Sequence, residues 1–327
     1  MFVRHCIYSV VVLFVSACAS HAPIDSTDIK LTAFWVNQSA GQIENLNNHL
    51  ASRFAPIIVP DQPQVSYNRV GKPVAAYNED GEEQISVSAE QPVFYFQQRD
   101  FSTDQASYTN LIYRMHFEGT PFYHLTSGDN VGLFVIVTIN AQKHPVLITT
   151  VHTCGCYLAF TPTQYMPADA FPKHWDETGQ QVYGQSLPSL LQWSGNDARP
   201  IIMLEDGTHR VRDIQIISTA HAKSAMHQAD TAIEAMAALK RLPLGSGNTS
   251  FFITEGDDKG YVKGSNKPWE FLFMSWWALD INIGVDKDYG DASKTGVLFY
   301  TDLNPKNREA SDMWPFARFL HYWGWRL

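Results

Sequence analysis

Short apolar runs separated by polar turns dominate the middle of the chain, and this pattern is typical of β-strands. Four such runs follow one another between residues 92 and 152: "PVFYFQ", "LIYRMHF", "VGLFVIVTIN" and "PVLITTVH". Because only the polar link 141–144 joins the last two, antiparallel pairing is the simplest arrangement. A further hairpin is expected in "RPIIMLEDGTHRVRDIQII", where Asp206-Gly207 provides the turn.

Helical spacing of apolar residues is found in fewer places. A short amphipathic helix is expected over residues 41–54, and a brief one over 187–193 inside the long excursion 161–199. The strongest helical pattern covers residues 220–242 and ends before Pro243; its aligned apolar positions are Ala225, Ala229, Ile233, Met236 and Leu239. The whole pattern predicts a mainly β fold, an antiparallel sandwich with added helices. A two-layer α+β domain is the alternative.

The C-terminal part of the chain is rich in aromatic residues. "PWEFLFMSWWAL", residues 268–279, is predicted to be a core helix, since a dozen residues are too few to cross a bilayer. The last 17 residues, "SDMWPFARFLHYWGWRL", are predicted to form a terminal helix that docks into the core. The alternative is a surface that binds envelope glycans or a partner protein, because tryptophan and tyrosine dominate such contacts.

Composition limits the classes of function. A chain of 327 residues with 45% hydrophobic and 17% charged residues can bury a sizeable core. Its formal net charge of -9 argues against a nucleic-acid partner, which requires a basic face.

The N-terminus has the pattern of an export signal. Arg4 and His5 precede the apolar run 7–15, which is too short to span a membrane. The following "VSAC" resembles the lipobox of bacterial lipoproteins, and the resemblance implies cleavage before Cys18 and a lipid on Cys18. Ala19 in place of aspartate then implies the outer membrane, with the protein facing the periplasm. A plain secretory signal or a membrane-anchoring helix is the alternative.

These observations suggest four regions. Residues 1–17 are expected to be the signal peptide, and 18–40 the lipidated cysteine with a tether, of which 19–30 is the polar part. Residues 41–242 are expected to form the β-rich main domain. Residues 243–327 are expected to form an aromatic-rich segment packed on that domain.

Two cysteines remain in the folded part once Cys6 leaves with the signal and Cys18 carries lipid. Cys154 and Cys156 alternate with His152, so on a strand the three side chains share one face. A straight strand would spread the outer two over roughly 13 Å, but Gly155 allows a bend. Two thiolates and an imidazole form a ligand set for zinc or copper(I). A fourth ligand is expected from His116 or His209, with His124 as a weaker candidate.

The same cysteines allow two other interpretations. In an oxidising compartment Cys154 and Cys156 are expected to form a disulfide if the geometry permits. That disulfide would be a local staple in a non-catalytic envelope interaction module, or an active thiol redox pair.

Other motifs indicate no reaction. Residues 279–291 offer oxygen ligands of the kind calcium uses, namely Asp280, Asn282, Asp286, Asp288 and Asp291. This segment fails the EF-hand pattern, so a solvated acidic loop is expected there. The chain has no Gly-x-Ser-x-Gly elbow, phosphate loop or His-Glu-x-x-His motif, and no catalytic residue is assigned.

One family resemblance bears on the fold. The order of "YRMHFEG", "VGLFVIVTI", "VLITTVHTCG" and "RPIIMLEDGTHRV" is similar to that in the β-sandwich of necrosis-inducing-peptide-like proteins and their vacuolar-sorting relatives. The resemblance implies a sandwich. It implies no activity, because Gly132 and Leu133 replace the tryptophan-glutamate pair of that family and its acidic metal-binding motif is absent.

Overall fold

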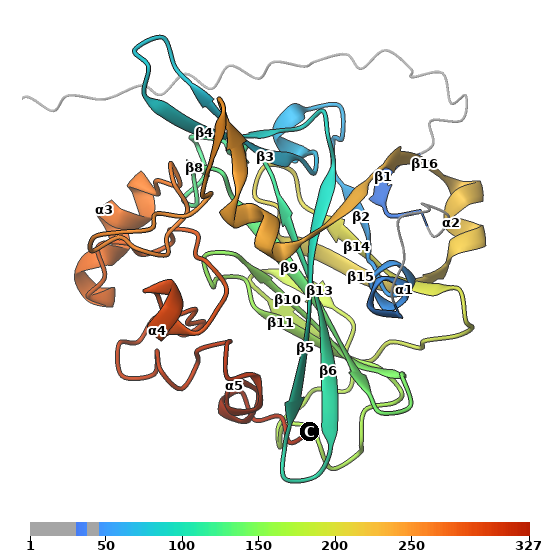
Figure 1. Ribbon diagram of the computed structural model, residues 1–327. Coiled ribbons are helices and arrows are strands. Elements are labelled where there is room, and N and C mark those ends of the chain that lie inside the picture. The colour runs from blue at the N-terminus through green and yellow to red at the C-terminus, as the bar shows by residue number, and fades with distance from the viewer. Residues whose placement is uncertain (1–30, 38–45) are drawn as a thin grey trace, which may run out of the picture. The chain divides into compact units, whose positions relative to one another are not determined.

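The computed structural model describes residues 31–37 and 46–327. Residues Leu31–Leu327 form one compact unit, in which strands outnumber helices (Figure 1). The expected fold class, β-rich with added helices, is confirmed. The predicted signal peptide, Cys18 and the polar part of the tether lie outside the described residues, as does the start of the helix expected over 41–54.

Two sheets form the body of this unit. The larger contains, in spatial order, β11 (Ala159–Pro162), β10 (Pro145–His152), β9 (Gly132–Asn140), β6 (Ser107–His116), β5 (Val93–Ser102) and β17 (Ala232–Ala235). The smaller contains β15 (Val211–Ser218), β14 (Ala198–Leu204), β2 (Ile57–Pro60), β1 (Leu31–Trp35) and β16 (Met226–Asp230). β1 lies in the range expected as a tether, and Phe34 and Trp35 are buried, so the fold begins before residue 41.

Shorter elements decorate the sheets. Four two-stranded ladders pair β3 (Lys72–Tyr77) with β4 (Glu83–Ser88), β7 (Gly119–Thr120) with β8 (Gly128–Asp129), β12 (Gln180–Val182) with β13 (Gln185–Leu187), and β18 (Leu242–Leu244) with β19 (Gly247–Thr249). The helices are α1 (Leu46–Arg53), α2 (Thr219–Ala225), α3 (Pro268–Ala278), α4 (Ala292–Thr295) and α5 (Phe316–Tyr322), with 3-10 turns η1 (Ser66–Asn68) and η2 (Met236–Lys240).

The predicted strand pairing is confirmed. β5, β6, β9 and β10 form antiparallel neighbours, and β14 and β15 form the hairpin that turns at Asp206-Gly207. β11, which was not predicted, pairs antiparallel with β10. Parallel pairing was not predicted, yet it joins β14 to β2, β1 to β16 and β17 to β5.

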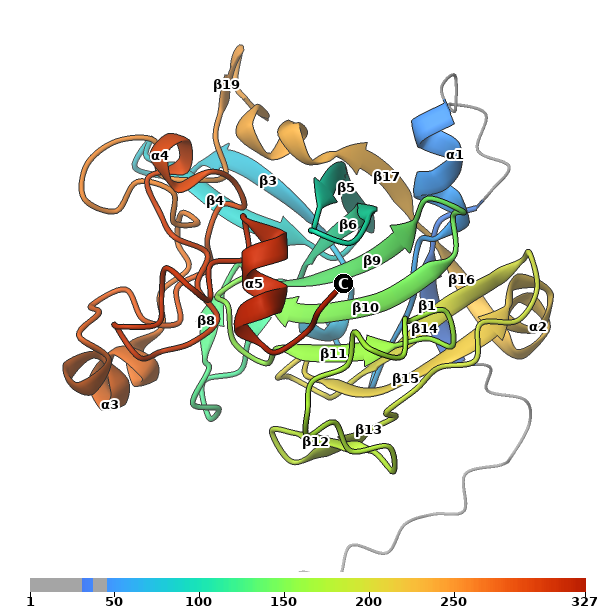
Figure 2. The same cartoon turned by 90° about the horizontal axis from the view of Figure 1, so that it is seen from below.

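The two sheets pack face to face, and β9 shows why its sequence is almost continuously apolar. Leu133, Val135 and Val137 belong to the core cluster shared with strands of the smaller sheet. Phe134 and Ile136 point to the opposite face and belong to a second cluster with the C-terminal segment. Both faces of the larger sheet are therefore buried (Figure 2). The outer face of the smaller sheet has its own cluster, to which Ala222 of α2 contributes.

The prediction of a helix over residues 220–242 is wrong beyond the first two turns. After α2 the chain forms β16, which pairs with β1, and then β17, which pairs with β5. This segment thus connects an edge of one sheet with an edge of the other. Backbone hydrogen bonds to two open sheet edges override the intrinsic helical preference of this alanine-rich segment. The brief helix expected over 187–193 is also absent from this described part of the chain.

The two aromatic segments behave differently. The terminal helix α5 docks into the core as predicted, with Phe316, Phe319 and Leu320 buried. The prediction that residues 268–279 form a core helix is wrong, because α3 is helical but exposes most of its apolar side chains. Among the described residues, no helix has the length and apolar composition needed to cross a membrane.

Candidate site at the disulfide turn

A tight turn follows β10 and contains both cysteines. The amide of Gly155 donates to the carbonyl of His152 at 2.8 Å, and the amide of His152 donates to the carbonyl of Cys156 at 2.9 Å. Gly155 has a φ of 97°, and a Cβ there would lie 2.1 Å from the carbonyl oxygen of Tyr300. Only glycine fits both constraints. The expected bend at Gly155 is therefore confirmed.

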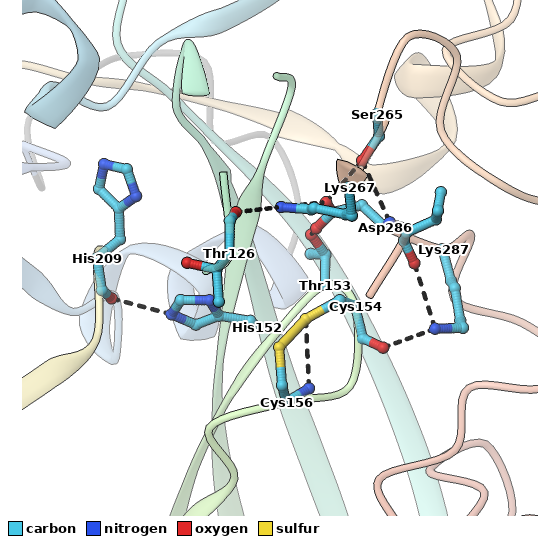
Figure 3. Close-up of a disulfide and its surroundings, with 11 residues drawn as sticks. Thr126, His152, Thr153, Cys154, Cys156, His209, Ser265, Lys267, Asp286 and Lys287 are labelled. Atoms are coloured by element: carbon cyan, nitrogen blue, oxygen red, sulfur yellow. Dashed lines mark hydrogen bonds and ion pairs between the residues drawn. A yellow bond between two sulfur atoms is a disulfide. The ribbon is translucent and has the colours of Figure 1, made fainter. Parts of the chain in front are cut away.

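Cys154 and Cys156 form a disulfide across this turn (Figure 3). Their Cα atoms lie 5.7 Å apart, and the amide of Cys156 donates to Sγ of Cys154 at 3.4 Å. Cys154 is 7% exposed and Cys156 is half-buried. In this oxidised form neither sulfur is a thiolate, so neither can yet act as a strong metal ligand.

His152 is held beside the disulfide in a defined tautomer. Its Nε2 lies 3.0 Å from the carbonyl oxygen of His209, which can only accept, so Nε2 carries the proton and Nδ1 keeps a lone pair. Burial lowers the pKa of His152 to about 4 and keeps the ring neutral at pH 7. One ligand atom each of His152, Cys154 and Cys156 lies within 4.8 Å of the others. These three residues therefore form a group that can hold a metal ion once the sulfurs are reduced.

The two histidines expected to supply a fourth ligand occupy other positions, and neither ring belongs to the group of three described residues. Nε2 of His116 accepts a 3.0 Å hydrogen bond from Nε of Arg114, so its lone pair is already used. The ring of His209 stacks on Phe117 at 4.1 Å, and its Nε2 donates to the carbonyl of Tyr67 at 2.8 Å. The backbone of His209, rather than its ring, contacts His152.

The acidic segment 279–291 is not the solvated loop that the sequence predicted. Asp286 is 1% exposed and accepts hydrogen bonds from the hydroxyls of Thr153 and Ser265, the latter at 2.8 Å. Nζ of Lys267 lies 3.6 Å from the same carboxylate. The carboxylate of Asp286 is therefore satisfied by protein groups, and it ties the residue before Cys154 to the C-terminal segment.

Lys287 supplies the second link to the turn. Its Nζ donates to the carbonyl of Cys154 at 2.6 Å, and its amide donates to the carbonyl of Thr153 at 2.9 Å. Lys287 is fully buried, and burial lowers its pKa to about 8. Nη1 of Arg114 donates to its carbonyl at 2.9 Å. Sequence reasoning missed Asp286 and Lys287 as supports of the turn, because they lie more than 130 positions from Cys154 in the chain.

We compared the chain with protein-family models, curated proteins and solved structures. None matches. The resemblance to the necrosis-inducing-peptide-like sandwich therefore gains no support from a solved structure.

The turn has two chemical states. In the oxidised state, the disulfide closes a ring over three residues beside a neutral imidazole. In the reduced state two thiols and the imidazole of His152 would lie together, and loss of the thiol protons would produce two soft ligands and one borderline ligand. Cys156, which is half-buried, is the more exposed of the two cysteines.

Proposed function

We propose that the protein is a lipoprotein, anchored through Cys18 at the periplasmic face of the outer membrane, whose His152-Cys154-Cys156 turn binds zinc or copper when its disulfide is reduced. The observation that carries the metal site is the grouping of three ligand atoms within 4.8 Å. A disulfide with a purely structural role requires no histidine beside its sulfurs.

The surroundings of His152 fit a metal ligand. Histidines that bind metals usually donate their other ring N–H to a carbonyl or carboxylate, which fixes the tautomer and the ring orientation. The hydrogen bond from Nε2 to the carbonyl of His209 has this form, and it leaves the lone pair of Nδ1 for a metal ion. Reduction by a dithiol transfers two electrons and two protons to the sulfurs, and metal binding then releases the thiol protons.

Three protein ligands leave a coordination position open. In zinc proteins such a position is typical of a site that activates water or passes the ion on, whereas structural sites use four protein ligands. Two thiolates and one imidazole also suit copper(I). The site would therefore sense, transfer or use a metal ion rather than stabilise the fold.

The membrane anchor rests on the leader sequence. A basic start, a short apolar run and "VSAC" support lipidation of Cys18, and Ala19 supports the outer membrane. An envelope location agrees with a disulfide between the cysteines that remain after processing.

Metal analysis of protein purified with and without a reductant tests the proposal. The reduced wild-type protein should carry zinc or copper in proportion to its chains, and the Cys154→Ala/Cys156→Ala variant should not. The His227→Gln variant is the control, because His227 is exposed on β16 and should leave the metal content unchanged. Metal-free reduced protein would reject the metal site.

The disulfide itself favours a second function. If the bond remains closed in the cell, Cys154–Cys156 is a local staple and the protein is an interaction module of the envelope. A thiol count on protein trapped by acid directly from cells distinguishes the metal site from the structural disulfide, because a structural disulfide predicts no free thiol at Cys154 or Cys156.

A further inference from the structure

Helix α3 has an unusual distribution of polar and apolar side chains. Its only charged residue, Glu270, is 5% exposed, whereas Phe271, Phe273 and Trp276 are 52%, 57% and 74% exposed. Soluble helices normally place their apolar stripe against the core and their charges in water. The exposed side chains of α3 therefore form an uncharged, largely aromatic surface.

Glu270 and Ala278 lie on the buried side of the helix. Glu270 packs against Gly284, where a Cβ would lie 1.6 Å from Oε2 of Glu270. Pro268 stands in the first turn, and Leu279 ends the helix with a φ of 52°. Rotating the helix to bury its aromatic residues would expel Glu270 from its place beside Gly284. The exposure of the aromatic residues is therefore a consequence of how α3 is seated.

A neighbouring loop extends this apolar surface. Phe122 and Tyr123, between β7 and β8, are 70% and 75% exposed. The ring of Trp269 lies 5.0 Å from that of Phe122, and Nε1 of Trp269 donates to the Phe122 carbonyl at 2.8 Å. We define the α3 surface as the exposed apolar residues of the helix and this loop: Phe122, Tyr123, Leu125, Phe271, Leu272, Phe273, Trp276 and Trp277.

We infer that the α3 surface inserts into the headgroup region of a lipid bilayer. α3 exposes phenylalanine, leucine and tryptophan around most of its circumference, and these residue types are typical of segments that lie in a membrane interface. The 11 residues of α3 project from the sheets at the edge of the molecule in both views (Figure 1 and Figure 2). A projecting helix with exposed bulky rings is buried readily by lipid, which deforms around it, whereas a protein partner needs a matching groove.

The chain that precedes the described residues supports a membrane as the partner. Thirteen positions separate Cys18 from Leu31, which at full extension reach about 43 Å. A lipid on Cys18 would hold the folded part within this distance of the bilayer, and this argument alone rests on the proposed lipidation. The net charge of -9 and the absence of charge on the exposed side of α3 make the insertion apolar rather than electrostatic.

Vesicle flotation of residues 19–327 tests this inference without the leader or the lipid. All described elements and core clusters lie in the compact unit Leu31–Leu327, so this chain retains the fold. It should float with phosphatidylcholine and phosphatidylethanolamine vesicles, with no requirement for anionic lipid and no loss in 0.5 M salt. The Leu272→Ser/Trp276→Ser variant should lower the partition coefficient at least about tenfold.

The matched control removes equally exposed aromatic rings elsewhere. Tyr77 and Tyr183 are 60% and 58% exposed, so Tyr77→Ser/Tyr183→Ser should leave partitioning unchanged. Circular dichroism is used to check that both variants fold. Absence of wild-type flotation, or equal loss in the control variant, would overturn the inference. A second copy of the chain is the alternative occupant. If the wild-type protein sediments as a dimer and does not bind vesicles, and the α3 variant sediments as a monomer, the inference is overturned in favour of that alternative. Because no lipid is attached, the result is independent of Cys18.

Discussion

The side-chain ammonium of Lys287 donates a 2.6 Å hydrogen bond to the carbonyl oxygen of Cys154, inside the disulfide turn. The same ammonium lies 3.2 Å from the carbonyl of Val285, and its centre is 4.5 Å from the centroid of the Tyr300 ring. A buried cation thus holds the turn against the C-terminal segment. The geometry of the candidate ligands depends on residues that are remote in the chain.

Replacing Lys287 by Met should therefore destabilise the protein. The substitution keeps the volume of the side chain but leaves the buried carbonyl of Cys154 and the part-buried carbonyl of Val285 without this donor, which lowers the free energy of unfolding by about 2–3 kcal/mol. Urea denaturation measures the change. Lys294→Met is the control, since Lys294 is exposed and its replacement should alter stability by less than about 0.5 kcal/mol. Equal effects of the two substitutions would contradict the supporting role of Lys287.

Gly155→Ala should disrupt the contact between the turn and Tyr300. An added Cβ would lie 2.1 Å from that carbonyl oxygen, and the φ of 97° is unfavourable for alanine as well. Gly184→Ala separates these effects, because Gly184 has a φ of 86° and nothing within 4 Å of an added Cβ. We expect the Gly184 variant to lose about 1 kcal/mol of unfolding free energy, and the Gly155 variant at least about 2 kcal/mol more. Similar losses of unfolding free energy in the two variants, measured by thermal or urea unfolding, would show that the contact between Gly155 and the carbonyl of Tyr300 does not restrict the residue at position 155.

Some parts of this fold could be predicted from the sequence because local pattern and final environment agree. The short apolar runs of β5, β6, β9 and β10 match buried strands, and the Asp206-Gly207 turn matches a hairpin. The segment after α2 could not be predicted, because its state is decided by two sheet edges that distant residues form. The exposure of α3 was missed for a similar reason, since its composition alone is that of a core helix.

The candidate site divides in the same way. The spacing of His152, Cys154 and Cys156, with Gly155 between the cysteines, indicated both the bend and the disulfide. The roles of Asp286 and Lys287 could not be read from a segment that resembles a solvated acidic loop. Buried charges are revealed by their partners, and these partners include Thr153 and Cys154 in the turn after β10.

The stability of the protein should fall in mild acid, partly through His116. This ring is fully buried, and burial, with Arg114 beside it, holds its pKa well below 6.5. The unfolded chain binds a proton at this residue below about pH 6.5 and the folded chain does not, so stability is retained above that pH and lost as the pH falls. One such histidine contributes a slope of about 1.4 kcal/mol per pH unit.

Urea denaturation between pH 7 and pH 5 measures this slope. The His116→Gln variant should show a slope smaller by about 1.4 kcal/mol per pH unit, whatever its stability at neutral pH. His227→Gln, at an exposed position, should keep the wild-type slope. If both variants keep the wild-type slope, His116 takes up a proton in the folded protein over the same pH range as in the unfolded chain, which would contradict the lowered pKa.

Lipidation of Cys18 has a direct chemical readout. Cells that express the full chain and receive radioactive palmitate should incorporate label into the wild-type protein and not into Cys18→Ala. Cys6→Ala is the control and should retain the label, because the proposed cleavage before Cys18 removes Cys6 with the leader. An unlabelled wild-type protein, or a labelled Cys18→Ala variant, would contradict the proposed anchor.

The central claim is that reduction of the Cys154–Cys156 disulfide creates a metal site with His152, and an anaerobic zinc titration against a chromophoric chelator tests it most directly. The reduced protein should bind one zinc ion per chain and the oxidised protein none. His152→Gln should weaken binding at least about tenfold, whereas His116→Gln should leave it unchanged, because Arg114 already occupies its lone pair. Reduced wild-type protein that binds zinc no more tightly than Cys154→Ala/Cys156→Ala would contradict the account.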